Sequence, residues 1–308
     1  MKIKKSVVLL IIAIFIFPIS ASAAPPCSCY DDRWLKLQDP PMSGQDVREI
    51  QIQLKNMGYH SNLINGIYDK ATTKAVKNFQ KREGLQIDGI FGPKTFNKLA
   101  ELFERPVANL DAKKPQGEVT LVLFALDREL VVLDDGKPFK SFPIAVGKFN
   151  TPTPIGLFTI TQKDAWGEGF GSRWMRLSVP WGIYGIHGTN KPWSVGAFES
   201  GGCVRMHNIH VEQVYEWVEI GTKVFIVGGV DGPFTFGLNP VTQGSKGSDV
   251  VEVQKRLSGY GLYNGAYDGI YEHKTEEAVI AFQKVNGLEP SGNVDAATYE
   301  ALGIFLFE

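Results

Sequence analysis

Two short segments of this sequence bring together residue types that can do chemistry. One is Ile186-His187-Gly188-Thr189, and the other is Ser200-Gly201-Gly202-Cys203-Val204-Arg205-Met206. A thiol becomes a strong nucleophile when a neighbouring base takes its proton, and imidazole is the commonest such base. Glycines beside the thiol let backbone N–H groups approach a reacting carbonyl oxygen, as an oxyanion hole requires. The pattern predicts Cys203 as a nucleophile and His187 as its base.

The compartment follows from the N-terminus, which has the features of a secretion signal. Lysines precede an apolar run, and Ala21-Ser22-Ala23 fits a cleavage site. We therefore expect a signal peptide over residues 1–23 and a leader over 24–42, with the folded part outside the cytoplasm. The alternative is an uncleaved membrane anchor, in which case the signal is the only contact with the membrane.

The use of cysteine is unusual for an exported chain, which has three cysteines in all. Cys27 and Cys29 can pair with each other, with a second chain or not at all, and Cys203 is then left over. A leftover cysteine is either a reactive thiol or a buried structural residue. The glycines and His187 favour the reactive thiol.

Composition limits the remaining function classes. The chain has 308 residues, 44% of them hydrophobic, and a net charge of −1. This length suggests two or three domains of ordinary globular character. Because no basic tract follows the signal, nothing predicts a nucleic-acid partner or long-range electrostatic steering.

An internal duplication frames the centre of the chain. Residues 44–99 match residues 247–302 without a gap, including Gln51 with Gln254 and Phe79-Gln80-Lys81 with Phe282-Gln283-Lys284. So long an ungapped match indicates two copies of one small domain.

Each copy is expected to form three short helices. In the first copy Val47, Ile50 and Leu54 recur at helical spacing. Asp69 is suited to cap the second helix, and Pro93 to begin the third. A unit of about 60 residues is near the lower limit for an independent core, so each copy should be a compact bundle.

The middle segment has the texture of a β-sheet protein. Residues Asp134 to Lys137 form a turn that makes the flanking strands a hairpin, and one helix is expected at about 207–218. The expected strands are 119–124, 130–133, 141–146, 156–161, 175–178, 182–186 and 223–227. The fold class is therefore α+β and multidomain. Its centre is a mostly antiparallel, sandwich-like sheet with one main helix, and two small three-helix domains flank it.

The two copies resemble peptidoglycan-binding-like domains, and we place them at 43–104 and 244–305. The resemblance rests on the pattern D-V-x-x-(I/V)-Q-x-x-L, then G-I-Y, then A-V-x-x-F-Q-K-x-x-G-L. It implies contact with peptidoglycan glycan. The alternative is that one or both copies only pack against the central domain.

The middle domain, which we place at 117–229, is similar to L,D-transpeptidase catalytic domains of the YkuD type. The matching motifs are Thr153-Pro154-Ile155-Gly156-Leu157-Phe158, His187-Gly188-Thr189 and the segment from Ser200 to Met206. Gly201 stands where many members of that family have histidine, which leaves the oxyanion geometry less defined.

This resemblance implies acyl transfer on peptidoglycan stem peptides, without a metal or a cofactor. Cys203 is implied to attack the carbonyl that joins the third residue to D-alanine, which forms a thioester and releases D-alanine. An amine of a neighbouring stem then completes a 3→3 cross-link and makes the chain an enzyme of cell-wall biogenesis. With water as the acceptor, the same site is an L,D-carboxypeptidase. Carbapenems are a further expected acylating agent of the thiol.

Each site residue then has an expected role. The carbonyl of Gly188 holds the second imidazole nitrogen, where a triad has a carboxylate. The N–H groups of Gly202 and Cys203 form the oxyanion hole, and the start of the following helix favours the thiolate. Arg205 orients the loop or a substrate carboxylate, or forms a structural ion pair. Ser200 and Asn208 shape the loop.

Other interpretations remain open from the sequence. Cys203, His207 and His210 have a spacing that a zinc site can use, but a fourth ligand is missing. His207 is an alternative base. Five aromatic residues before Cys203 pack in the core or line a groove: Trp166, Phe170, Trp174, Trp181 and Trp193. We expect His60 and His273, in the two copies, at the surface. A non-catalytic wall-binding scaffold is the third function considered.

Overall fold

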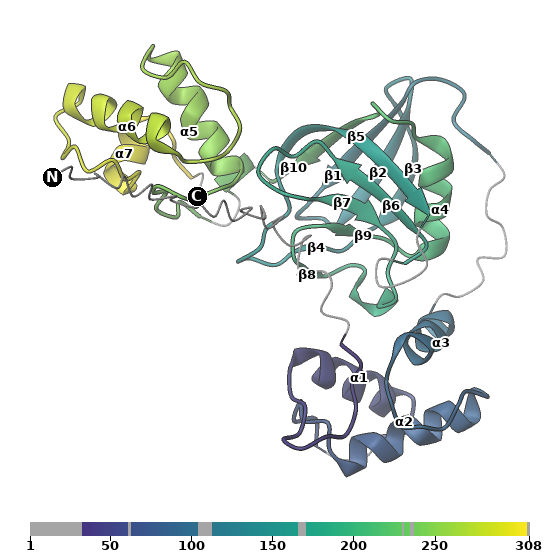
Figure 1. Ribbon diagram of the computed structural model, residues 1–308. Coiled ribbons are helices and arrows are strands. Elements are labelled where there is room, and N and C mark those ends of the chain that lie inside the picture. Colours follow the sequence, from purple (N-terminus) through teal and green to yellow (C-terminus); the bar gives the residue numbers. More distant parts are fainter. Residues whose placement is uncertain are drawn as a thin grey trace, which may run out of the picture.

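The computed structural model describes residues 33–60, 63–103, 113–165, 171–229, 231–234 and 237–306. The expected signal peptide, Cys27, Cys29, Trp166 and Phe170 lie outside these residues. Within the described part of the chain, no helix is both long and apolar enough to cross a membrane. The structure forms three packed units, with a small helical domain on each of two sides of a central sheet domain (Figure 1).

Each small domain contains three helices, as the duplication predicts. They are α1 (Gln45–Asn56), α2 (Lys70–Arg82) and α3 (Pro93–Phe103) in the first copy, and α5 (Ser248–Gly259), α6 (His273–Val285) and α7 (Ala296–Ala301) in the second. The Asp69 side chain accepts a hydrogen bond from the Thr72 N–H at the start of α2, so the predicted cap is confirmed. Val47, Ile50 and Leu54 are buried on the inner face of α1.

The central domain is one curled eight-stranded sheet with the order β3-β2-β1-β10-β5-β6-β7-β9. Its strands are β1 (Val119–Phe124), β2 (Glu129–Asp134), β3 (Lys137–Pro143), β5 (Gly156–Ala165), β6 (Arg173–Leu177), β7 (Gly185–His187), β9 (Val204–Arg205) and β10 (Lys223–Val227). The strands β4 (Val146–Gly147) and β8 (Phe198–Ser200) form a separate parallel pair.

The sheet curls because the long strand β5 belongs to both of its halves. The first part of β5 pairs with β10, and its second part pairs with β6 after a register irregularity between Ile160 and Gln162. Only β1–β10 and β7–β9 pair in parallel within this sheet, so the prediction of a mostly antiparallel sheet is confirmed. The hairpin turn is also confirmed, since Asp135 and Gly136 both have positive φ, at 49° and 73°.

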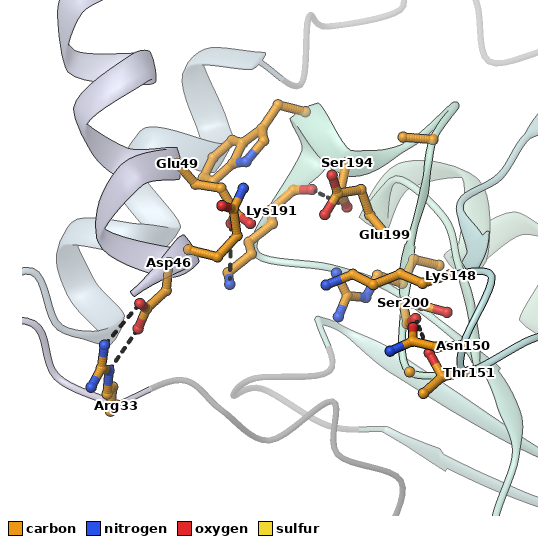
Figure 2. A pocket seen from close by; sticks show the side chains of 15 residues that line it. Arg33, Asp46, Glu49, Lys148, Asn150, Thr151, Lys191, Ser194, Glu199 and Ser200 are labelled. Carbon is orange, nitrogen blue, oxygen red and sulfur yellow. Dashed lines mark hydrogen bonds and ion pairs between the residues drawn. The ribbon is translucent and has the colours of Figure 1, made fainter. Parts of the chain in front are cut away.

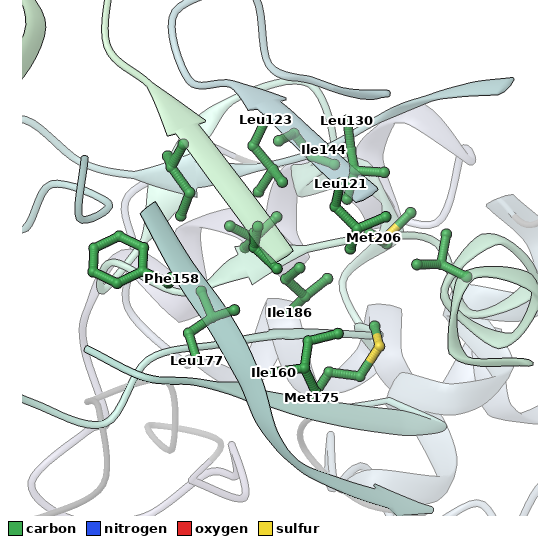
Figure 3. Packing of buried hydrophobic residues seen from close by; sticks show 14 of the residues in the cluster. Leu121, Leu123, Leu130, Ile144, Phe158, Ile160, Met175, Leu177, Ile186 and Met206 are labelled. Atoms are coloured by element: carbon green, nitrogen blue, oxygen red, sulfur yellow. The ribbon is translucent and has the colours of Figure 1, made fainter. Parts of the chain in front are cut away.

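One hydrophobic cluster fills the curl. It joins residues of β1 and β2, such as Leu121 and Leu130, to residues of β5, β6 and β7, such as Ile160, Met175 and Ile186 (Figure 3). The helix α4 (Asn208–Trp217) adds Val211 and Val214 to this cluster from outside the sheet. The strands β7 and β9 and the helix α4 are thereby held together through one cluster.

Two short 3₁₀ helices, η2 (Pro192–Ser194) and η3 (Gly232–Phe234), lie where the small domains meet the rest of the chain. Trp193 of η2 packs against the core of the first copy, and Phe234 of η3 belongs to the core of the second. The first copy is therefore docked on the central domain by an apolar contact, and the linker residue Phe234 completes the core of the second.

Candidate functional site

The sheet register places His187 and Cys203 on one face. The strands β7 and β9 run in parallel with Ile186 opposite Val204, and both of these side chains are in the core. Because side chains alternate between the faces of a strand, His187 and Cys203, which flank that pair, project from the other face. Arg205 lies directly opposite His187 in the register and shares this face.

Trp174 is the common neighbour of the imidazole and the thiol. It lies opposite His187 in the pairing of β6 with β7, and the two ring centroids are 5.6 Å apart. Trp174 also packs with Cys203 and Ile183 in a small buried cluster. The sequence suggested only core or groove packing for Trp174, because its contact with both His187 and Cys203 depends on strand register.

The orientation of the imidazole is set by the backbone carbonyl of the next residue. Nδ1 of His187 lies 2.6 Å from the carbonyl oxygen of Gly188, which is the contact that the resemblance implied. A carbonyl oxygen can only accept, so Nδ1 carries the proton and Nε2 is the basic nitrogen of the neutral ring. His187 is 1% exposed and Cys203 is fully buried.

Asn208, the first residue of α4, holds the chain around Gly188. Its Oδ1 accepts hydrogen bonds from the N–H groups of Ser172 at 3.0 Å and Thr189 at 3.2 Å, and its Nδ2 donates to the Thr189 carbonyl at 3.0 Å. A Cβ at Gly188 would lie 2.1 Å from that Oδ1, so only glycine fits. The motif H-G-T thus has a steric reason for its glycine.

The loop before Cys203 is closed by Ser200. The Ser200 hydroxyl donates to the Cys203 carbonyl and accepts from the Gly202 N–H at 3.0 Å. Gly202 has a φ of 114°, and a Cβ there would lie 2.7 Å from the Tyr184 ring. Ser200 is therefore a loop-shaping residue, as expected, and Gly202 is required by the backbone.

Two expectations about the surroundings of the thiol need correction. The Gly202 N–H, predicted to donate to an oxyanion, is already bonded to Ser200, because the loop folds back on that hydroxyl. Cys203 was also expected directly before a helix, but strand β9 intervenes and α4 begins at Asn208. The field of a helix end falls off within one turn, so the sequence position of Cys203 gives no reason to expect this helix to stabilise its thiolate.

The T-P motif positions this loop from the opposite side. Thr153 Oγ1 accepts from the Gly147 N–H at 2.8 Å, and Gly147 lies opposite Ser200 in the β4–β8 pair. Thr151 Oγ1 donates to the Ser200 carbonyl at 3.1 Å. The motif therefore acts on the thiol segment through β4 and β8.

Two cavities open beside the loop, and each has one copy of the small domain as a wall. A cavity of about 500 Å³ lies against the first copy, and one of about 720 Å³ lies against the second. Both are lined by Asn150, Thr151 and Gly201, so they meet at the loop that leads to Cys203. Arg205 lines the smaller cavity. Neither cavity is lined by His187 or Cys203, whose side chains are covered.

The remaining histidines have structural surroundings. His207 and His210 lie edge to face, 5.4 Å between ring centroids, and His210 packs against Phe142. Burial, His207 and Lys140 together lower the pKa of His210 to about 4. In the described residues, no group of three or more His, Cys, Asp or Glu could hold a metal ion.

The surface prediction for His60 was wrong, because this residue is 4% exposed, with Nε2 3.5 Å from Thr72 Oγ1 inside the first copy. The surface prediction for His273 is confirmed. Its side chain is 75% exposed at the start of α6 and lies beside Glu276 and Glu277.

Comparisons with known proteins agree with this architecture. A family model described as "L,D-transpeptidase catalytic domain" matches residues 120–226, and one described as "Putative peptidoglycan binding domain" matches residues 43–99 and 246–302. The chain is 44% identical over 100 residues to "Putative L,D-transpeptidase YkuD" of Bacillus licheniformis. The matched segment covers 32% of this chain and 59% of that protein. It is 33% identical over 137 residues to "Putative L,D-transpeptidase YqjB" of Bacillus subtilis, which covers 39% of this chain and 78% of that protein.

The chain therefore belongs to the L,D-transpeptidase family, with a YkuD-type catalytic domain flanked by peptidoglycan-binding domains. It spans 59% and 56% of the first two curated relatives that it matches. Among solved structures, an L,D-transpeptidase from Mycobacterium smegmatis is 25% identical, with a TM-score of 0.32 over 35% of this chain and 58% of that one.

Proposed function

We propose that this chain is a cysteine acyltransferase that forms 3→3 cross-links in peptidoglycan. His187 Nε2 takes the proton of the Cys203 thiol, and the sulfur attacks the carbonyl between the third residue of a stem peptide and D-alanine. The C–N bond breaks, D-alanine leaves with a proton from Nε2, and a thioester remains. A side-chain amine of a second stem then attacks the thioester carbonyl, which restores the thiol.

One observation carries this proposal: the register of β7 with β9 puts His187 and Cys203 on the same face, around Trp174. The contact with the Gly188 carbonyl favours the proton on Nδ1, so Nε2 is the basic nitrogen that can take the thiol proton. The same contact stabilises the imidazolium that forms when the thiolate is generated.

The oxyanion that forms on attack needs donors, and the Cys203 N–H remains the candidate. The Gly202 N–H can contribute only after it leaves the Ser200 hydroxyl, so we assign it to the loop in the resting state. Because the thiol is fully buried, substrate binding must move side chains that cover Cys203.

The proposal extends to the substrate and the location of the enzyme. A transpeptidase must hold two stem peptides at one sulfur, and the two cavities that meet at Gly201 provide two approaches. We assign stem peptides to these cavities and glycan to the small domains. The site of action is then outside the cytoplasm, in the cell wall. Carbapenems are expected to acylate Cys203.

The test is product analysis with purified muropeptides. Incubation of the enzyme with disaccharide-tetrapeptide should give dimers that have lost one D-alanine, and Cys203→Ala should abolish them. Retained cross-linking by that variant contradicts the proposal. Tripeptide monomers without dimers would instead identify an L,D-carboxypeptidase.

A non-catalytic scaffold is tested by thiol reactivity. Intact mass after incubation with a carbapenem should show one adduct on the enzyme and none on Cys203→Ala, which also controls for Cys27 and Cys29. An enzyme that neither turns over muropeptides nor gains this adduct would be a scaffold with an inert thiol.

A further inference from the structure

The smaller cavity is shared by two domains and carries an unusual density of charge. It lies between the first peptidoglycan-binding domain and the catalytic domain (Figure 2). Four cationic and three anionic side chains line it: Arg33, Lys148, Lys191, Arg205, Asp46, Glu49 and Glu199. A site for a purely anionic or purely cationic ligand would be built from one sign of charge.

The cavity is a built site because the two domains are docked around it. Trp193 of the catalytic domain packs against the core of the small domain. Lys191 Nζ lies 3.6 Å from a carboxylate oxygen of Glu49 and 5.9 Å from the centre of the Phe96 ring. The Lys191 and Glu49 side chains are only 16% and 19% exposed. This mostly buried ion pair joins the two domains at the cavity.

Several of the charges around that pair are not satisfied by the protein. Within the described parts of the chain, Lys148, Glu199 and Arg205 form no side-chain hydrogen bond or ion pair. Glu199 and Arg205 are half-buried, and burial raises the pKa of Glu49 while Lys191 opposes it. Lys148 is exposed, but the charges of Glu199 and Arg205 are partly withdrawn from water, which is costly unless a ligand compensates them.

The position of the cavity connects it to the chemistry. Ser200 and Gly201 line it, and both precede Cys203 in the same loop. Arg205 stands opposite His187 in the β7–β9 register. A ligand group held among these charges lies next to the segment that carries the thiol.

We propose that this cavity binds a zwitterionic amino-acid group, and that Glu49 of the first peptidoglycan-binding domain is a specificity-determining residue for it. The ligand carboxylate faces Arg205 and Lys148, and the ammonium faces Glu199 and Glu49. This proposal rests on the proposed function, since such a group ends the side chain of a diamino acid in a stem peptide. The first small domain is then a wall of the substrate site.

The duplication supplies a matched control. Glu252 of α5 occupies the position in the second copy that Glu49 of α1 occupies in the first. There it pairs with Arg256 of its own helix, at 2.8 Å, and does not line the smaller cavity. Glu49→Gln and Glu252→Gln thus remove the same charge from the same place in two copies of one domain.

Three blocked probes separate the two charges of the ligand. All three are Nα-acetyl α-amides. The side chain of the 2,6-diaminopimelic acid probe ends in both an ammonium and a carboxylate. The lysine probe ends in the ammonium only, and the 2-aminopimelic acid probe ends in the carboxylate only. Binding is measured by calorimetry on the full chain carrying Cys203→Ala, so the result does not depend on turnover.

We expect the diaminopimelic probe to bind at least about tenfold more tightly than either single-charge probe. Glu49→Gln should weaken that probe by about tenfold and leave the carboxylate-only probe unchanged. Glu252→Gln should change neither. Trp193→Ala, which removes the docking contact and no charge, should weaken the diaminopimelic probe as Glu49→Gln does.

Equal affinity for the three probes, or equal behaviour of Glu49→Gln and Glu252→Gln, overturns the proposal. Failure of the proposed function looks different: the enzyme would leave muropeptides unchanged while the binding pattern persists. In the active enzyme, Glu49→Gln should raise KM for the dimerisation reaction by about tenfold and change kcat less.

Discussion

Asn208→Ala tests whether the segment after His187 is held in place by a single side chain. The variant removes the hydrogen bonds that the side chain accepts from two backbone N–H groups and donates to one backbone carbonyl, at 3.0 to 3.2 Å. At about 1 kcal/mol for each bond, the free energy of unfolding should fall by about 3 kcal/mol. Because Asn208 is half-buried, water can replace some of the lost hydrogen bonds in the variant. The expected decrease in the free energy of unfolding is therefore at least about 2 kcal/mol.

Activity should fall together with stability in this variant. The carbonyl that orients Nδ1 belongs to Gly188, directly before the Thr189 that Asn208 binds. Loosening this segment lets the imidazole rotate away from the thiol, and misplacement by about 1 Å can cost about a hundredfold in rate. The measurements are kcat/KM for cross-linking and urea denaturation followed by tryptophan fluorescence. Five of the six tryptophans lie between residues 117 and 229, so this signal reports the catalytic domain.

Two further variants make the experiment specific. Asn208→Asp keeps the acceptor for both N–H groups but places an oxygen against the Thr189 carbonyl oxygen in place of the donor, so its loss of stability should be at least about 1 kcal/mol. Asn286→Ala in the second small domain removes one hydrogen bond, to the Phe282 carbonyl at 2.8 Å, and should leave cross-linking unchanged. The reasoning is refuted if Asn208→Ala unfolds and reacts like the parent enzyme.

A double-mutant cycle adds an independent check. Gly188→Ala should be strongly destabilising alone, because its Cβ would lie 2.1 Å from the Asn208 oxygen. In the Asn208→Ala background that oxygen is gone, so the same substitution should cost less. Additive losses would show that the two residues do not meet as described.

Three other predictions concern the surroundings of the site. His210→Leu should flatten the pH dependence of stability. In the parent protein, the unfolded chain binds a proton near pH 6.5, whereas the folded ring binds one only near its pKa of about 4. The free energy of unfolding therefore falls as pH drops through this window, by about 1 kcal/mol after allowance for partial exposure. Equal pH slopes for the variant and the parent would contradict this prediction. Gly202→Ala should cost at least about 2 kcal/mol in urea denaturation, because φ is 114° and the new Cβ would meet Tyr184; an unchanged midpoint would be inconsistent with that loop. Thr153→Val should lower stability by about 1 to 3 kcal/mol and reduce cross-linking, since the Gly147 N–H loses its buried acceptor, whereas full activity would show that this contact does not support the thiol loop.

The sequence revealed the small domains in more detail than the central sheet. Their pattern contains a glutamine whose purpose becomes clear in the structure. Gln51 Nε2 donates to the Ile67 carbonyl at 3.0 Å and to Thr72 Oγ1 at 2.9 Å, while its Oε1 accepts from the Gly66 N–H at 2.9 Å. One buried amide thus ties the first helix to the loop before the second. Local motifs of this kind are readable because donor, acceptor and turn lie within one short stretch.

The strands that build the site were harder to predict. The first and last strands, 119–124 and 223–227, agree with the expected ranges because their apolar residues alternate or run together. Strands β8 and β9 have three and two residues and were not predicted. Such short strands carry no periodicity, and the pairing of β7 with β9 depends on contacts distant in sequence. The motifs pointed to His187 and Cys203 as the candidate site residues, but their common neighbour, Trp174, required the register.

The two small domains share a buried glutamine amide and differ in how they contact the catalytic domain. Gln254 makes the contacts of Gln51, with its Oε1 accepting from Gly269 as Gln51 accepts from Gly66. Both copies turn the start of their first helix toward the catalytic domain, but the contacts differ there. The first copy is joined through the ion pair of Glu49 with Lys191, and the second through Ser248, whose hydroxyl accepts from the Ile155 N–H at 2.8 Å. Ile155 follows the T-P motif, so the second copy bears on the loop that supports the thiol, whereas the first forms the charged wall of the smaller cavity. The same duplicated unit, with the same buried glutamine and the same glutamate on its first helix, therefore meets the catalytic domain through different contacts in its two copies.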